Sequence, residues 1–186
     1  MTCGQDRSIR LWNPHKSDVV KDDCLLIKTY TGVHGYDIQD IAISKDNEKF
    51  SSCGRDKLVF VWDVASGRVI RRLQGHEQRV NAVEYNEDAS VLLSGSYDST
   101  VRIWDMRARH ARQPIQILDH FKDSVTSIAV SSHEILCSSV DGCLRIYDLR
   151  VGNCIADEVH GTLLECKMTY RSREISPYRT YFIVTG

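Results

Sequence analysis

The chain has 186 residues, of which 42% are hydrophobic and 26% are charged, ordinary proportions for one soluble globular domain. It carries 24 basic and 25 acidic side chains, so its formal net charge is −1. A balance this even argues against broad electrostatic binding to nucleic acid or to an anionic membrane. No apolar run approaches the roughly 20 residues that a membrane-spanning helix needs. The stretch from Met1 to Asp6 has no secretory signal pattern.

The chain contains 7 cysteines, and none of them belongs to a Cys-x-x-Cys pair. The odd number and the spacing argue against a zinc knuckle and against a thioredoxin-like site. Cys3 and Cys53 stand at equivalent positions of the repeat described below, where Gly95 and Ser138 also stand. Such a position needs a small side chain rather than a metal ligand. We therefore expect reduced, mostly buried thiols of an intracellular protein, with no metal and no cofactor.

One pattern occurs four times along the chain. In its clearest copy Asp56 is followed six residues later by Trp62, and Trp62 by Asp63. The same spacing links Asp6 to Trp12, Asp98 to Trp104 and Asp141 to Tyr147. Successive aromatic residues are 50, 42 and 43 positions apart. A period near 42 with an aromatic–aspartate ending is typical of the four-stranded blade of a β-propeller.

The repeat divides the chain into blades. We expect a partial first blade at residues 1–31, full four-stranded blades at 32–74, 75–118 and 119–157, and a partial or aberrant fifth blade at 158–186. In the third blade, the pattern predicts an inner strand at 80–85, a second from 91, a third at 101–104 and an outer strand at 114–118. Val101 and Ile103 alternate with Arg102, as in a half-buried strand. The corresponding strands are expected at 38–43, 49–53, 58–62 and 69–73, and at 125–130, 135–137, 144–147 and 153–156.

The two ends of the chain do not form whole blades. The run Thr2-Cys3-Gly4 matches Ser52-Cys53-Gly54, which lies in a second strand. The fifth blade is expected to begin near residues 160–162 and to have its second strand at 181–184, but residues 170–179 fit the repeat poorly. The fold class is therefore all-β, an incomplete β-propeller. We interpret the chain as a piece of a longer propeller or an incomplete gene model, whose exposed sheet edges favour aggregation.

Histidine, serine and aspartate recur together in a way that resembles a catalytic triad. His76 lies 22 residues before Asp98 and 28 before Trp104, with Ser94 between them. A catalytic group is needed once, whereas this set is repeated in the second blade. We therefore expect a structural hydrogen-bond chain from indole to hydroxyl to imidazole to carboxylate, and no enzyme activity. The second blade supplies His34, Asp56 and Trp62.

The fourth copy departs from this pattern. Tyr147 replaces tryptophan, Cys137 replaces the hydroxyl, and His120 is one residue out of register. We expect Asp141 and Tyr147 to form a weaker network there. Elsewhere the chain has no glycine-rich phosphate loop, Walker lysine or Gly-x-Ser-x-Gly motif. A basic cluster follows Trp104 and comprises Arg107, Arg109, His110 and Arg112. It is either a solvated loop or a binding site for a phosphorylated or acidic segment of a partner.

The Gly75-His76 pair, the Ser-x-Asp turns and the Trp-Asp endings resemble the WD-repeat family over residues 1 to about 157. The runs His34–Tyr36 and Trp62–Gly67 resemble, within that family, scaffolds that organise mitogen-activated protein kinase cascades. The resemblance implies a total of seven blades, a non-catalytic scaffold role, a second association with the spliceosome, and a cytoplasmic and nuclear location. The implied partners are proteins, either kinase-cascade components or splicing factors, with no membrane, small-molecule or direct nucleic-acid ligand.

A scaffold of this kind would bind its partners on the rim where each inner strand starts and each second strand ends. Exposed arginine and tyrosine are common interface anchors. The alternative for each rim residue is that it is a solvated loop position with no binding role. The candidates before each turn aspartate are Arg55, Tyr97 and Val140, and those entering each inner strand are Asp37, Gln39, Arg79, Asn81 and Ser124.

A second function is a substrate receptor of a cullin-RING ubiquitin ligase. The endings Trp104-Asp105-Met106-Arg107 and Tyr147-Asp148-Leu149-Arg150 resemble the Trp-Asp-x-Arg ending of such receptors. In that case, Arg107 and Arg150 would contact a shared adaptor.

Overall fold

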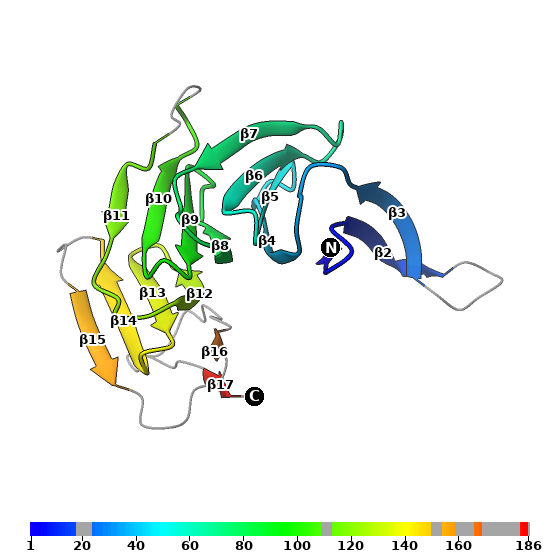
Figure 1. Cartoon of the computed structure of the whole chain (residues 1–186). Helices are drawn as coiled ribbons and strands as arrows, with labels where there is room; N and C mark the ends of the chain where they lie inside the picture. Colours follow the sequence, from blue (N-terminus) through cyan, green and yellow to red (C-terminus); the bar gives the residue numbers. More distant parts are fainter. Residues whose placement is uncertain (18–23, 109–112, 150–153, 159–165, 169–182, 186) are drawn as a thin grey trace.

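The computed structural model describes residues 1–17, 24–108, 113–149, 154–158, 166–168 and 183–185. Every regular element in this part of the chain is a β-strand, and the strands form five antiparallel sheets. The sheets follow one another around an arc, with the fifth near its lower end (Figure 1). The predicted all-β class is confirmed, and the sheets have the arrangement of propeller blades.

Three sheets have four strands each, and each is a simple meander from an inner to an outer strand. The first is β4 (Ile38–Ile43), β5 (Lys49–Gly54), β6 (Leu58–Asp63) and β7 (Val69–Gln74). The second is β8 (Val80–Tyr85), β9 (Val91–Ser96), β10 (Val101–Asp105) and β11 (Gln116–Leu118). The third is β12 (Val125–Val130), β13 (Glu134–Ser139), β14 (Cys143–Asp148) and β15 (Cys154–Glu158). We call these sheets blades two, three and four.

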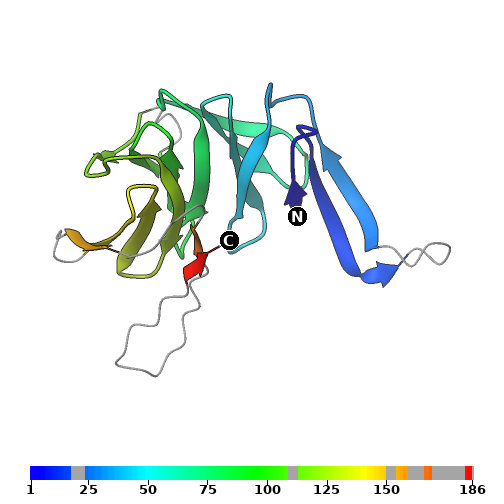
Figure 2. The same cartoon turned by 60° about the horizontal axis from the view of Figure 1, so that its bottom comes forward.

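The two remaining sheets are smaller. The first sheet, blade one, contains β1 (Thr2–Cys3), β2 (Ile9–Ser17) and β3 (Cys24–Tyr30), and the last contains β16 (Cys166–Met168) and β17 (Ile183–Thr185). Figure 2 shows the three-stranded sheet projecting at one end of the arc. The two-stranded sheet contacts β12 and β13 of the third four-stranded sheet. The outer strand of blade three starts at Gln116, two residues later than predicted. The expected start of the fifth blade at 160–162 and the irregular stretch 170–179 lie outside the described residues.

Three of the four hydrophobic cores in the described part of the chain lie between neighbouring blades, and the fourth is a small cluster of blade-four residues. In β6, Phe60 and Trp62 pack toward blade one, whereas Val59 and Val61 pack toward blade three. Period-two alternation therefore places apolar side chains on both faces of a strand that is sandwiched between two sheets. The same division holds in β10, where Trp104 joins the core shared with blade two, and its neighbour Ile103 joins the core shared with blade four.

Each inner strand carries a β-bulge at the same place. The pairing with the second strand shifts between Ile38 and Asp40 in β4, between Val80 and Ala82 in β8, and at the corresponding step in β12. A bulge leaves one residue out of the ladder and re-aims its side chain. The residues skipped in this way include Gln39 and Asn81, both predicted rim positions.

The cysteines are less buried than predicted. All five whose side chains are described are free thiols, but only Cys53 and Cys137 are buried. Cys3 and Cys143 are half-buried and Cys154 is exposed. The prediction of mostly buried thiols is therefore wrong for this part of the chain. Cys3 is the repeat equivalent of Cys53, but it lies in the small sheet of blade one, where its side chain is less completely buried. Burial raises the pKa of the Cys53 and Cys137 thiols.

Blades three and four lie close together at Gly95. A Cβ atom at this position would lie 2.6 Å from Val125 Cγ1 and 3.0 Å from Ile128 Cδ1, both in β12. The small-residue requirement inferred from the repeat therefore has a direct steric cause at Gly95, whose equivalents in blades two and four are Cys53 and Ser138.

Gly95→Ala is expected to lower the free energy of unfolding by about 1–3 kcal/mol, because two packed side chains must shift. Gly35→Ala provides the matched control, since no atom lies within 4 Å of its added Cβ. Urea denaturation of both variants measures the difference. Equal effects of the two substitutions would contradict the close approach of β9 and β12.

Candidate functional site

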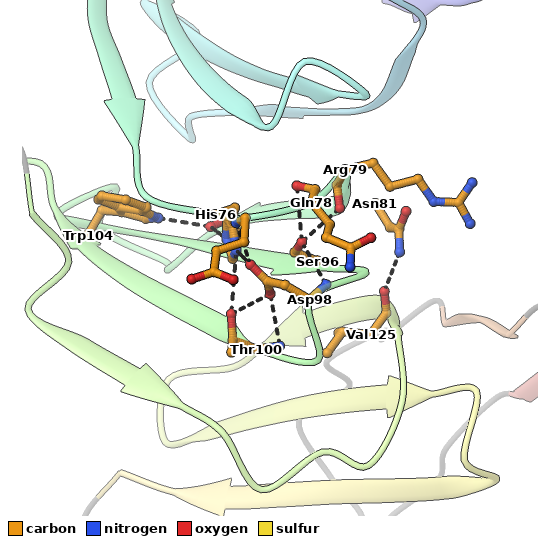
Figure 3. Close-up of polar contacts among 11 residues, drawn as sticks. His76, Gln78, Arg79, Asn81, Ser96, Asp98, Thr100, Trp104 and Val125 are labelled. Atoms are coloured by element: carbon orange, nitrogen blue, oxygen red, sulfur yellow. Dashed lines mark hydrogen bonds and ion pairs between the residues drawn. The ribbon is translucent and has the colours of Figure 1, made fainter.

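The repeated polar residues of blade three form one continuous hydrogen-bond chain (Figure 3). Trp104 Nε1 donates to Ser94 Oγ at 2.9 Å, Ser94 Oγ lies 2.8 Å from His76 Nε2, and His76 Nδ1 lies 2.9 Å from Asp98 Oδ2. A neutral histidine protonated on Nδ1 satisfies every link, because Ser94 then donates to Nε2 and Asp98 accepts from Nδ1. The histidine and serine are buried. The chain therefore joins the loop before β8 to β9 and β10.

Asp98 is the end point of this chain and the organiser of the turn between β9 and β10. Besides His76, its carboxylate accepts from the backbone N–H of Glu77 at 2.9 Å, from the Thr100 N–H at 3.1 Å and from the Thr100 hydroxyl at 2.5 Å. Burial tends to raise the pKa of Asp98, but these hydrogen bonds, that of His76 first, outweigh it and hold the pKa well below its usual value. Folding therefore favours the ionised carboxylate.

Blade two repeats the chain. Trp62 Nε1 donates to Ser52 Oγ at 2.8 Å, Ser52 Oγ lies 2.7 Å from His34 Nε2, and His34 Nδ1 lies 2.6 Å from Asp56 Oδ2. Ser52 was not predicted to belong to this chain, although it precedes Ser94 by the same 42 residues that separate Asp56 from Asp98. In blade one, Trp12 Nε1 donates to Thr2 Oγ1 at 2.8 Å, so a hydroxyl again receives the indole.

In blade four the turn aspartate is paired with an arginine rather than a histidine. Arg145 Nη2 lies 2.9 Å from Asp141 Oδ2, and Arg145 Nη1 donates to Ser139 Oγ at 2.9 Å. The Tyr147 hydroxyl lies 3.4 Å from His120 Nδ1. Asp141 and Tyr147 thus belong to separate contacts. The expectation that they share one weakened hydrogen-bond chain is wrong. Cys137 provides no hydroxyl to link them, and the Asp141 carboxylate is paired with Arg145.

An arginine four residues after the turn aspartate substitutes for histidine. Arg10 pairs with Asp6 at 2.6 Å in blade one, as Arg145 pairs with Asp141 in blade four. In blade three the equivalent arginine is Arg102, but the Asp98 carboxylate is hydrogen-bonded to His76 instead. The Nε of Arg102 is buried and has no hydrogen-bond partner within the described part of the chain.

The predicted rim residues separate into two groups. Arg55 and Tyr97 are exposed, and so are Arg79, Gln39 and Val140. Asp37 is half-buried and pairs with Arg55 at 3.4 Å. The Arg79 guanidinium lies 4.6 Å from the centre of the Tyr97 ring. These side chains surround the turns of blades two and three and are accessible to a partner.

Asn81 and Ser124 are placed differently. Asn81 Nδ2 donates to Ser124 Oγ at 2.9 Å and to the Val125 carbonyl at 2.7 Å. Ser124 is buried, with 2% of its surface exposed. The bulge in β8 directs Asn81 toward blade four, so these two residues connect neighbouring blades. For Ser124, the expected exposed rim position is wrong.

The residue after each turn aspartate has a left-handed backbone. The φ angles are 61° at Arg7, 65° at Lys57, 61° at Ser99 and 78° at Gly142. Glycine adopts this region without strain, whereas residues with a Cβ do so at a cost of about 1–2 kcal/mol. The sequence showed the recurring aspartate but not this conformational requirement of its neighbour.

A polar cavity of about 490 Å³ lies on the opposite rim, where the inner strands of three blades end. Glu84 lines it and stands where blades two and four have Ala42 and Ala129. Burial, and then the nearby Asp40 carboxylate, raise the pKa of Glu84 to about 7. The other charged or titratable groups of the lining are Lys45, Tyr85, Glu87, His133 and Glu134.

Three segments of the chain match the model of the family described as "WD domain, G-beta repeat": residues 25–63, 67–105 and 112–148. The chain belongs to the WD40 family. Each match begins at the outer strand of one sheet and ends with the third strand of the next. A WD40 repeat therefore connects two neighbouring blades covalently, in addition to the cores between them.

The relatives of the chain include WD repeat domain-containing protein 83 of Xenopus tropicalis, with 51% identity over 89% of this chain and 50% of the relative. The WD repeat domain-containing protein 83 homolog of Dictyostelium discoideum is 36% identical over 85% of this chain and 54% of its own. Pre-mRNA-splicing factor cwf17 of Schizosaccharomyces pombe is 30% identical over 81% and 42%. The chain thus spans about half the length of the first of these relatives.

The fold is also similar to a solved structure of U3-55K, with a TM-score of 0.73 and 20% identity over 86% of this chain and 48% of that one. This likeness supports the propeller architecture alone. Among the described residues, no group of three or more His, Cys, Asp or Glu side chains is placed to hold a metal ion. The same part of the chain contains no helix that is long and apolar enough to cross a membrane.

Ser94→Ala is expected to lower the free energy of unfolding by about 2–4 kcal/mol, because it leaves the Trp104 N–H and His76 Nε2 buried without partners. Chemical denaturation measures this loss, with exposed Ser132→Ala as the control. In a double-mutant cycle with His76→Ala, a coupling energy of about 0.5–3 kcal/mol is expected. Additive effects would show that the chain does not act as a unit.

Glu84→Gln is expected to stabilise the protein at pH 8 and to have a smaller effect at pH 5. Because the folded state raises the pKa of this carboxyl, its contribution is fully present below about 4.5 and is lost as the pH rises through about 7. Thermal unfolding of both proteins across this range measures the difference. Exposed Glu87→Gln serves as the control, and a pH-independent gain for Glu84→Gln would refute the assignment.

Proposed function

We propose that the chain is part of a non-catalytic scaffold that assembles other proteins along the rim formed by the turns of its blades. The observation that carries this proposal is the division of polar residues. The repeated groups, such as His76 and Ser94, are buried and bonded to each other, whereas unrepeated groups such as Arg79 and Tyr97 are exposed on the rim. Repetition in blades two and three favours a structural role for the first group and leaves the second for recognition.

The assemblies we propose are mitogen-activated protein kinase cascades, pre-mRNA splicing complexes or both, in the cytoplasm and the nucleus. The splicing half is supported by the 30% identity to a protein named a pre-mRNA-splicing factor. The kinase half rests on the resemblance of the runs His34–Tyr36 and Trp62–Gly67 to kinase-cascade scaffolds. The likeness to WD repeat domain-containing protein 83 is consistent with either assembly.

The ubiquitin-ligase alternative has less support. The side chain of Arg107 lies 3.8 Å from Asp105 on its own strand end, and 77% of it is exposed. Its counterpart Arg150 lies outside the described residues. We keep this function only as an outcome of the experiment below.

Affinity purification of the chain from cells, followed by mass spectrometry, is expected to recover kinase-cascade proteins, splicing factors or both. Tyr97→Ala should reduce that recovery roughly ten-fold or more, because exposed aromatic anchors dominate interface energies. Ile115→Ala, which removes an exposed side chain away from the rim, is the control. Recovery of splicing factors alone would exclude the kinase role, and a cullin adaptor as the main partner would support the alternative.

A further inference from the structure

The rim contains an open hollow of about 510 Å³ between blades two and three. The turn after β5 contributes Arg55 and Lys57 on one side. The loop that enters β8 and the turn after β9 form the other side. We call it the blade 2–3 hollow, and its lining is Arg55, Lys57, Glu77, Gln78, Arg79 and Tyr97.

The charge of the hollow differs from that of the whole chain. Three of its six lining side chains are cationic and one, Glu77, is acidic, whereas the chain has a net charge of −1. Arg55 is partly neutralised by Asp37, at a long distance of 3.4 Å. Lys57 is exposed and has no ion pair within the described part of the chain. The hollow is therefore an isolated basic surface that attracts an anionic group.

Lys57 occupies a backbone position where glycine would be more stable. Its φ is 65°, and Arg7, Ser99 and Gly142 have the same left-handed conformation in the other blades, of which only Gly142 adopts it without strain. The turn therefore imposes the conformation in each of these blades. At Lys57 this position places a cationic side chain beside the hollow.

The geometry favours a peptide over a nucleic acid. Proteins that bind single strands present free aromatic faces on which bases stack, together with a basic groove along the phosphates. In the hollow, the Arg79 guanidinium already covers one face of Tyr97, 4.6 Å from the ring centre. Asp37 and Glu77 also stand among the cations. A short acidic segment matches three cations in one hollow, whereas a continuous phosphate backbone needs a longer basic track.

We infer that the blade 2–3 hollow binds an acidic, Asp- and Glu-rich segment of a partner protein, with Lys57, Arg55 and Arg79 contacting its carboxylates. This inference rests on the proposed scaffold function and specifies the chemistry of one partner segment. It assigns Lys57 a binding role that opposes its effect on stability, and this opposition makes it testable.

The test is an NMR titration of the ¹⁵N-labelled chain with a hexaglutamate peptide. The expected shifts are confined to the amides of residues 55–57, 77–79 and 97 and weaken with added salt. Lys57→Gly is expected to raise the melting temperature, because it relieves the left-handed strain, and to weaken binding roughly two- to five-fold, the effect of one exposed charge pair. Lys57→Arg, which keeps the charge, should bind like the unchanged chain.

Ser99→Gly is the matched control, because it relieves the same strain at φ 61° in blade three without removing a charge. It should raise the melting temperature and leave hexaglutamate binding unchanged. Unchanged binding by Lys57→Gly, shifts located elsewhere, or tighter binding of a single-stranded oligouridylate than of hexaglutamate would each overturn the inference.

Affinity purification with the same variants separates this inference from the proposed function. If Lys57→Gly recovers the same proteins in the same amounts as the unchanged chain, the scaffold function stands and the inference about the hollow fails. If no protein partner is recovered with either chain while hexaglutamate binds in a Lys57-dependent way, the scaffold function fails and the chemistry of the hollow stands.

Discussion

The carboxylate at each turn between the second and third strands is the group on which the rest of this structure depends. It accepts the backbone N–H of the residue two positions later in all four blades, which fixes the turn, and in blades two to four it is partly desolvated. In blade three, Asp98 accepts from Glu77, Thr100 and His76 at once. A carboxylate in this environment needs a donor or cation that stays in place. The remaining polar residues of each blade are arranged to supply one.

The blades use two arrangements to meet this requirement. In blades two and three, a histidine in the loop before the inner strand contacts the carboxylate through Nδ1. Its Nε2 is hydrogen-bonded to a serine, which in turn accepts from a tryptophan. Blades one and four use an arginine from the third strand itself, as Asp6 with Arg10 and Asp141 with Arg145 show. The histidine arrangement links the loop, the second strand and the third strand, whereas the arginine arrangement is local to one hairpin. The choice therefore determines how firmly the rim loop before the inner strand is held.

This difference explains how far the sequence could lead. The period of about 42 residues, with the alternation of Val101 and Ile103 with Arg102, predicted the strands closely, because each repeat forms the same four-stranded sheet packed against its neighbours. The hydrogen-bond partners His76, Ser94 and Trp104 were predicted because they repeat. The ion pair of Arg145 was missed, since a salt bridge between residues four apart has no distinctive spacing in a strand. The burial of Ser124 was missed because it depends on a bulge in the neighbouring blade, which redirects Asn81.

The comparison between blades also separates residues that maintain the fold from residues that do not. A group that recurs in register serves the same structural purpose in each copy, so its loss is a loss of stability. Lys57 and Glu84 depart from their counterparts in other blades, and each destabilises the folded chain, one through backbone strain and the other through burial of a carboxyl beside Asp40. Neither is explained by packing. Glu84 stands where blades two and four have alanine, and Lys57 stands where blade four has glycine. At both positions a side chain is kept that a more stable residue could replace, and Lys57 lies on the rim that is open to a partner.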